Sequence, residues 1–365
     1  MSSARAMAGC YGRLALARHL LAVVFSLFVG WTAVSRGAAA EPPQALRNTG
    51  LYSDFGLLTI DPKHLAFSPQ YPLWSDGATK RRWISLPAGT AIDGSNPDAW
   101  IFPLGTRFWK EFSFGGQRVE TRFLERRADG QWLYAAYAWS ADGSEAQLVS
   151  DKGKRGAYPL AAGRGHTIPG VSDCQVCHQG EVLGFSALQL SPGRDPGAVH
   201  AESLPTPGVD LRYLVDNGLL VGLPRQYLET PPRIKARDAT ERAALGYMHG
   251  NCGHCHNENG PLANLELILR QSVARSAPTA IVSTVGHAVR KLAPGQPADA
   301  VLRIAPHHPD RSGLLKRIAS RYPPLQMPPL GTELVDEEAV SLIRKWIAEL
   351  DEPDKTINQE EGDVR

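Results

Sequence analysis

The chain has 365 residues, of which 39 are Lys or Arg and 37 are Asp or Glu. Four of the basic residues lie in an N-terminal leader, so removal of that leader would leave 35 basic and 37 acidic residues, a net charge of −2. This balance argues against nucleic acid as a partner, and the remaining length suits two or three compact units.

The first forty residues are typical of a secretory signal. They contain four arginines and no acidic residue, an apolar run from Leu20 to Val34, and the alanines Ala38 to Ala40 just before Glu41. We expect cleavage after Ala40 and export to the periplasm. The alternative is an uncleaved anchor, which is less favoured because the run is short for a spanning helix; no stable membrane span is expected after cleavage.

Residues 41–165 are predicted to form an antiparallel β-rich domain, arranged as a small sandwich or half-barrel. Aromatic and β-branched residues fill the runs 106–114, 117–126 and 131–140, and Gly115-Gly116, Asp129-Gly130 and Asp142-Gly143 separate or end them. Six of the eight tryptophans lie in this region, and we expect them to pack in the core. Lys80-Arg81-Arg82 is predicted to be a solvated strand end.

Two copies of one pentapeptide follow: Cys174-Gln-Val-Cys177-His178 and Cys252-Gly-His-Cys255-His256. Cys-x-x-Cys-His is the attachment motif of a c-type haem, in which the thiols bind the porphyrin covalently and the histidine binds the iron. The sequence therefore predicts two covalently attached haem c groups, with His178 and His256 as proximal iron ligands.

Other uses of these cysteines explain the sequence less well. A structural zinc site needs four ligands, and a disulfide framework does not explain the adjacent histidines. Thioredoxin-like chemistry would need a βαβ setting, which neither pair has. No catalytic triad, phosphate-binding glycine loop or carboxylate cluster at metal spacing was found, so no catalytic residue is predicted.

Two helices are predicted around the second motif. Asp238 and Glu241 form a capping box for a helix over 239–250, which leads to Cys252. Acidic residues at 336–338 begin a second helix, in which apolar residues recur at helical spacing up to Leu350. Residues 351–365 are predicted to be a disordered acidic tail.

Residues 231–350 resemble a class I cytochrome c domain: a helix leading to Cys-x-x-Cys-His, a methionine before proline, and an aromatic residue in the last helix. The resemblance implies that Met327 is the second iron's distal ligand and that the first and last helices cross. Ala243, Ala244 and Tyr247 would then face Trp346 and Leu350, and a carbonyl near Pro261 would bond the proximal imidazole.

The whole mature chain resembles a bacterial family of di-haem c-type cytochromes, known as conserved hypothetical secreted proteins. The segments that carry the resemblance are Tyr71-Pro-Leu-Trp-Ser-Asp-Gly-Ala78, Phe102-Pro-Leu-Gly-Thr106, Val119-Glu-Thr-Arg122, Leu183-Gly-Phe-Ser-Ala-Leu-Gln-Leu190, Asn251-Cys-Gly-His-Cys-His256 and Gln326-Met-Pro-Pro-Leu-Gly331. It implies an α+β protein: a β-rich domain, a first haem-binding segment (166–230) and a mainly α, cytochrome c-like second haem domain (231–350).

The distal ligand of the first iron stays open. Met248 is expected in the core, which leaves His166, His200, His249, His287 or no protein ligand. We expect electron transfer with a periplasmic redox partner protein. The alternatives are a di-haem peroxidase or oxidase with an open first haem, which Glu181 or a histidine would assist, and the cytochrome subunit of a periplasmic dehydrogenase.

Overall fold

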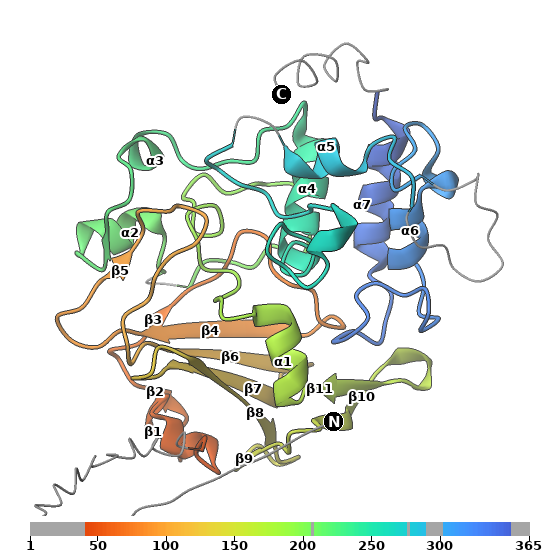
Figure 1. The fold of residues 1–365 in the computed structure, drawn as a ribbon. Helices are drawn as coiled ribbons and strands as arrows, with labels where there is room; N and C mark the ends of the chain where they lie inside the picture. The colour runs from red at the N-terminus through yellow and green to blue at the C-terminus, as the bar shows by residue number, and fades with distance from the viewer. Residues whose placement is uncertain (1–40, 206–207, 276–277, 290–301, 352–365) are drawn as a thin grey trace, which may run out of the picture. The chain divides into compact units, whose positions relative to one another are not determined.

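A computed structural model describes residues 41–205, 208–275, 278–289 and 302–351 (Figure 1). The predicted leader and residues 352–365 of the predicted acidic tail lie outside the described residues. Asp351, the first residue of that tail, forms an ion pair with Arg237 at 2.8 Å.

The N-terminal part is built on one six-stranded antiparallel sheet, with the strand order β3-β4-β6-β7-β8-β9. Its strands are β3 (Leu65–Ala66), β4 (Thr79–Ser85), β6 (Arg107–Phe114), β7 (Gln117–Arg126), β8 (Trp132–Trp139) and β9 (Ala146–Leu148). The expected antiparallel sheet is confirmed. The other described strands form only two-stranded sheets, so there is no second large sheet among the described residues and the predicted sandwich is wrong.

The local sequence explains how consecutive strands of the sheet are joined. Gly115 and Gly116 both have positive φ, which a tight turn between right-twisted strands requires, and they join β6 to β7. Alternate residues of the strands face opposite sides of the sheet. Five of the six tryptophans are less than 10% exposed, as predicted, whereas Trp132 is only partly buried.

The remaining strands are short. They are β1 (Tyr52–Asp54) with β2 (Thr59–Ile60), β10 (Lys154–Pro159) with β11 (Gly165–Ile168), and β5 (Ile92–Asp93), which pairs in parallel with β12 (Leu220–Val221). The helices are α1 (Val171–His178), α2 (Leu211–Asp216), α3 (Gln226–Glu229), α4 (Ala239–Asn251), α5 (Thr279–Thr284), α6 (Gly313–Ile318) and α7 (Glu337–Ala348).

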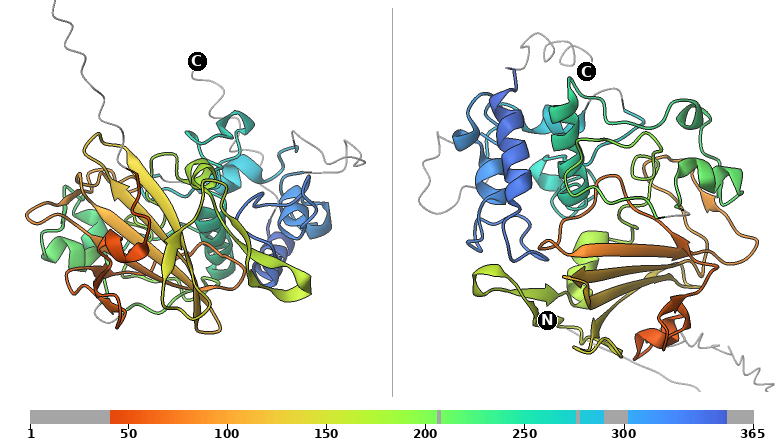
Figure 2. Two further views of the ribbon diagram at one scale, coloured as in Figure 1. Left: turned by 90° about the horizontal axis from the view of Figure 1, so that it is seen from below. Right: turned by 180° about the vertical axis from the view of Figure 1, so that it is seen from behind.

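Helices α4 and α7 begin where the sequence predicts. The Asp238 carboxylate accepts a bond from Glu241 N at 2.8 Å, and that of Asp336 accepts one from Ala339 N at 3.1 Å. The helices run beside one another (Figure 2), and Trp346 Nε1 donates to Glu241 Oε2 at 3.2 Å between them.

The expected contact between these helices is confirmed in most of its residues. Ala244, Tyr247, Trp346 and Leu350 belong to one buried cluster. Ala243 is also buried, but it lies beside Gly197.

The prediction for Lys80-Arg81-Arg82 is wrong. These residues lie within β4, so their side chains alternate between the two faces of the sheet. Arg81 is exposed, but Lys80 is 8% and Arg82 6% exposed, and both are therefore buried cations.

The described chain is α+β, as predicted, with β-structure first and helices later. Within its described residues, the stretch 231–350 has the helices α4 to α7 and only isolated β-bridges. No described helix combines the length and the apolar character needed to cross a bilayer. The predicted domain boundaries stay predictions.

We expect Trp346→Ala to lower the free energy of unfolding by about 3–5 kcal/mol, because it removes a fully buried indole between α4 and α7. Tyr322→Ala is the control, since Tyr322 is 62% exposed, and it should change this free energy by less than about 0.5 kcal/mol. Urea titration followed by far-ultraviolet circular dichroism measures both, and equal losses would contradict the packing described.

Candidate functional site

The first motif is itself helical. Helix α1 begins after Gly170, whose N–H donates to Asp173 Oδ2 at 3.0 Å, and ends at His178, where Gln179 turns into the left-handed region. Cys174, Cys177 and His178 are spaced three and four residues apart, so they lie on one side of the helix.

The His178 ring is held in one orientation. Its Nδ1 lies 2.9 Å from Glu181 O, and because a carbonyl can only accept, Nδ1 carries the proton and Nε2 keeps a lone pair. Tyr134 of β8 lies against the ring, with 5.2 Å between the centroids. Burial, with the nearby cations Arg122 and Lys110, lowers the pKa of His178 to about 4, so the imidazole is neutral near pH 7.

The second motif follows the end of α4. Cys252 is the C-cap of that helix, and Cys255 N and His256 N donate to its carbonyl at 3.1 and 2.9 Å. His256 is 8% exposed, and burial lowers its pKa to about 4. The bond that the resemblance implied near Pro261 is not formed, because His256 Nδ1 is buried without a partner among the described residues.

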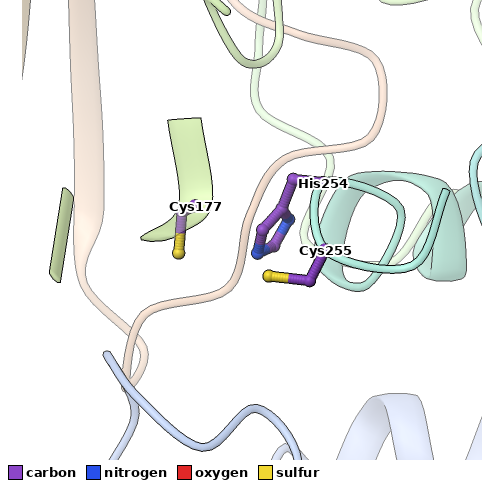
Figure 3. A group of neighbouring side chains, drawn as sticks. All are labelled: Cys177, His254 and Cys255. Atoms are coloured by element: carbon purple, nitrogen blue, oxygen red, sulfur yellow. The ribbon is translucent and has the colours of Figure 1, made fainter. Parts of the chain in front are cut away.

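The two motifs meet in space although 78 positions separate them. The Cys177 and Cys255 sulfurs and a ring nitrogen of His254 all lie within 4.8 Å of one another. Figure 3 shows Cys177 on α1, and His254 and Cys255, from the segment after α4, extending toward its side. The neighbouring Cys255 thiol, together with burial, raises the pKa of Cys177 to about 12, whereas the Cys177 thiol lowers the pKa of Cys255.

The other two thiols are controlled by burial. It raises the pKa of Cys174 to about 11 and that of Cys252 to about 12. None of the four motif cysteines forms a disulfide.

An ion pair joins the surroundings of the two motifs. Arg270 Nη2 lies 2.7 Å from Glu181 Oε2, and Glu181 is the residue whose carbonyl orients His178. The backbone N–H groups of Leu269 and Arg270 both donate to His256 O, at 2.8 and 3.3 Å. One short segment therefore bonds His256 directly and is linked to His178 through Glu181.

The segment 71–76 connects α4 to the sheet. Trp74 N donates to Asn251 Oδ1 at 2.7 Å, directly before the second motif. Tyr71 packs so closely on α4 that a Cβ at Gly246 would lie 2.0 Å from its ring, and one at Gly250 would lie 2.5 Å from its carbonyl oxygen. Only glycine permits this approach.

Asp76 ends that segment and joins two further parts of the chain. Its Oδ1 accepts from Glu333 N and Leu334 N, at 2.7 and 3.0 Å, and its Oδ2 lies 3.2 Å from His166 Nδ1. His166 is 1% exposed, and its Nε2 lies 3.2 Å from Glu120 Oε2. The imidazole is thus held between two carboxylates.

The predicted distal histidines differ in their contacts. His166 and His200 have carboxylate partners for both ring nitrogens, and His287 is exposed. His249 Nδ1 accepts from Gln271 N at 3.0 Å.

The two methionines lie at one buried cluster. Met248 is 1% exposed, as expected for a core residue. Met327 is partly buried and packs against the cluster that Cys252 also contacts.

Sequence reasoning missed three residues beside the first motif: His254, Lys110 and Arg122. His254 occupies a variable position of the second motif, and nothing in the pattern assigns it a partner. Lys110 and Arg122 lie in strands whose alternation shows that they share a face, but not that α1 covers it.

Comparisons with known proteins found no family model, no curated protein and no solved structure that matches this chain.

The residues present fit covalently attached haem. Each motif offers two free thiols and an imidazole that is neutral near pH 7. His256 Nδ1 is a buried polar atom without a partner among the described residues. Cys177, His254 and Cys255 could instead hold a metal ion as three ligands, one fewer than a structural zinc site normally uses.

We expect His166→Gln to destabilise the protein most at acid pH. Burial opposes the charge on His166, but its bonds to Asp76 and Glu120 outweigh burial and raise its pKa. A raised pKa stabilises the fold below the unfolded value of 6.5, and this contribution is lost as the pH rises through the folded pKa. The difference in unfolding free energy from the unsubstituted protein, about 2 kcal/mol near pH 5.5, should therefore shrink toward pH 9.

Urea titrations at a series of pH values measure this difference. His287→Gln is the control, because His287 is exposed. A difference that grows with pH would show that His166 is not cationic in the folded chain.

Proposed function

We propose that this chain is a periplasmic di-haem c-type cytochrome that transfers electrons between redox partners. Haem bound through the two motifs supplies reversible one-electron transfer at iron. The observation that carries the proposal is the meeting of both Cys-x-x-Cys-His motifs at one place, with Cys177, His254 and Cys255 within 4.8 Å of each other. Two redox groups attached there would be neighbours, as a relay requires.

The chain's own residues bind and orient in this proposal. Cys174 and Cys177 would hold the first group and Cys252 and Cys255 the second, with His178 and His256 as proximal ligands. Glu181 O fixes the proton on His178 Nδ1, so that Nε2 keeps the lone pair that a metal needs. The Glu181–Arg270 ion pair keeps the surroundings of the two motifs together.

Met327 is proposed as the distal ligand of the second iron. Support comes from its packing against the same cluster as Cys252, and from two bonds that hold its backbone: Met327 N donates to Arg317 O at 3.0 Å, and Arg321 Nη1 donates to Met327 O at 3.4 Å. A thioether opposite imidazole raises the reduction potential of haem iron.

The geometry favours a relay over the peroxidase alternative. Glu181, the acid that an open first haem would use, is paired with Arg270 at 2.7 Å. The candidate histidines of the first segment, His166 and His200, are each bound to two carboxylates.

A second candidate is a bound metal ion. The ligand set Cys177, His254 and Cys255 favours it, because two sulfurs and one imidazole suit zinc. It would use one sulfur from each motif, whereas haem attachment uses both sulfurs of each.

The first test is the mass of the exported protein, which should exceed that of the polypeptide by two haem groups. Cys174→Ala with Cys177→Ala, and Cys252→Ala with Cys255→Ala, should each remove one group. His254→Ala is the discriminating control, because it should leave both haems attached but would weaken the three-ligand metal site. A polypeptide mass alone, with zinc found by elemental analysis, would support the second candidate.

Closeness of the two groups gives a separate prediction. Neighbouring chromophores couple, so the Soret circular dichroism of the loaded protein should have a paired positive and negative lobe. The lobes should be absent from each variant that carries one haem. The same single-sign band in all three proteins would contradict a coupled pair.

We expect Met327→Ala to lower one of the two reduction potentials and leave the other nearly unchanged, because the ligand that favours ferrous iron is lost. Spectroelectrochemical titration measures both potentials. Met248→Ala is the matched control: it removes a buried methionine that we assign to packing only. Unchanged potentials in Met327→Ala would overturn the assignment.

A further inference from the structure

A row of cations crosses the sheet beside the first motif. Register places Arg82 of β4 opposite Lys110 of β6, and Lys110 opposite Arg122 of β7, so all three side chains share one face. Lys80, two residues before Arg82, lies on the same face. Like charges directly opposite one another on a sheet are destabilising, so this row needs compensation.

Only part of the compensation comes from the chain. Arg82 Nη2 bonds Glu202 Oε1 at 3.2 Å, and Arg122 Nη2 bonds Glu120 Oε2 at 3.2 Å. Lys110, at the centre of the row, has a cation–π contact with Phe112, 4.8 Å from the ring centroid. Within the described residues, neither the Lys80 nor the Lys110 side chain has a hydrogen bond or an ion pair, although Lys80 is only 8% exposed.

These lysines are under electrostatic strain. Burial, followed by the repulsion of Arg82, lowers the pKa of Lys80 to about 8, and burial with the repulsion of Arg82, Arg122 and Lys80 lowers that of Lys110 far below its ordinary value. An anion beside them would remove this strain.

The row lies at the first motif. Cys174 packs against the buried cluster that contains Phe108 and Leu124, and these two residues share a face of β6 and β7 with Lys110 and Arg122. Arg122 and Lys110 also help to lower the pKa of His178. Helix α1 packs on β8, the strand next to β7 (Figure 1). Lys110 on β6 and Lys80 on β4 lie two and three strands away from β8. This placement suits the propionate edge of a porphyrin, which is opposite the edge that the two thioethers hold.

We propose that Lys80 and Lys110, flanked by Arg82 and Arg122, form a carboxylate-binding site that takes the propionates of the haem attached at Cys174 and Cys177. The inference rests on the proposed function, because the carboxylates belong to that haem. Two ammonium groups without a hydrogen bond or an ion pair match anionic oxygens in charge and in hydrogen-bond donors. The site neutralises the propionates and raises the potential of the first haem, since positive charge disfavours the oxidised state.

The test compares Lys110→Met and Lys80→Met with Lys154→Met, which removes an exposed lysine on β10. All are purified as loaded protein, and haem content is checked by mass. The first two should lower one of the two reduction potentials and shift the propionate bending bands in the resonance Raman spectrum. Lys154→Met should change neither, and Lys110→Arg should retain most of the original potential.

Other results would overturn the proposed site, the proposed function or both. Loaded protein in which Lys110→Met and Lys80→Met match Lys154→Met overturns the site and leaves the proposed function intact, whereas protein without haem overturns both. If the lysine variants do not accumulate, the unsubstituted protein decides: propionate bands at the position of free carboxylates for both haems overturn the site.

Acetate titration at constant ionic strength distinguishes two sources of the carboxylate. Occupancy by propionate predicts potentials that do not depend on acetate. A saturable change that Lys110→Met abolishes would show that the site takes a dissociable organic acid and would overturn the propionate assignment.

Discussion

The contacts of residues 71–76 are the constraint on which the rest of the site depends. This short segment leaves the sheet, packs Tyr71 into the groove that Gly246 and Gly250 open on α4, and gives its Trp74 N–H to Asn251. It ends at Asp76, which bonds His166 before the first motif and the backbone at 333–334 after Met327. Together with the Glu181–Arg270 ion pair, this segment fixes the second motif relative to the sheet on which the first motif packs.

The fold follows from ordinary patterns in the sequence. Strands β6 and β7 match the predicted runs within one residue because turn glycines and aromatic alternation are local signals. The starts of α4 and α7 were predictable because a capping carboxylate acts within one turn. The sandwich prediction failed because strand patterns do not reveal what packs against each face. Here those partners include the segments from Phe185 to Tyr227.

The site was predictable in its chemistry but not in its arrangement. Each pentapeptide identifies two thiols and a histidine from its sequence alone, but no local pattern indicates that Cys177 and Cys255 lie close together. The prediction that Lys80 and Arg82 are solvated failed for a related reason. Three consecutive charged residues predict exposure, but successive side chains of a strand face opposite sides of the sheet, so Lys80 and Arg82 share the buried side. Burial of these cations depends on β4 lying between β3 and β6.

The groove on α4 also has a consequence for the evolution of the gene, because the residues that fill it are encoded far upstream of α4. Gly246 and Gly250 weaken a helix interior, and their benefit is realised only when Tyr71, some 175 positions upstream, fills the space they leave. A gene fragment that began near residue 231 would encode α4 with its groove empty and Asn251 without its Trp74 partner. We therefore expect selection to remove gene variants that separate the two parts and to keep both parts in one open reading frame.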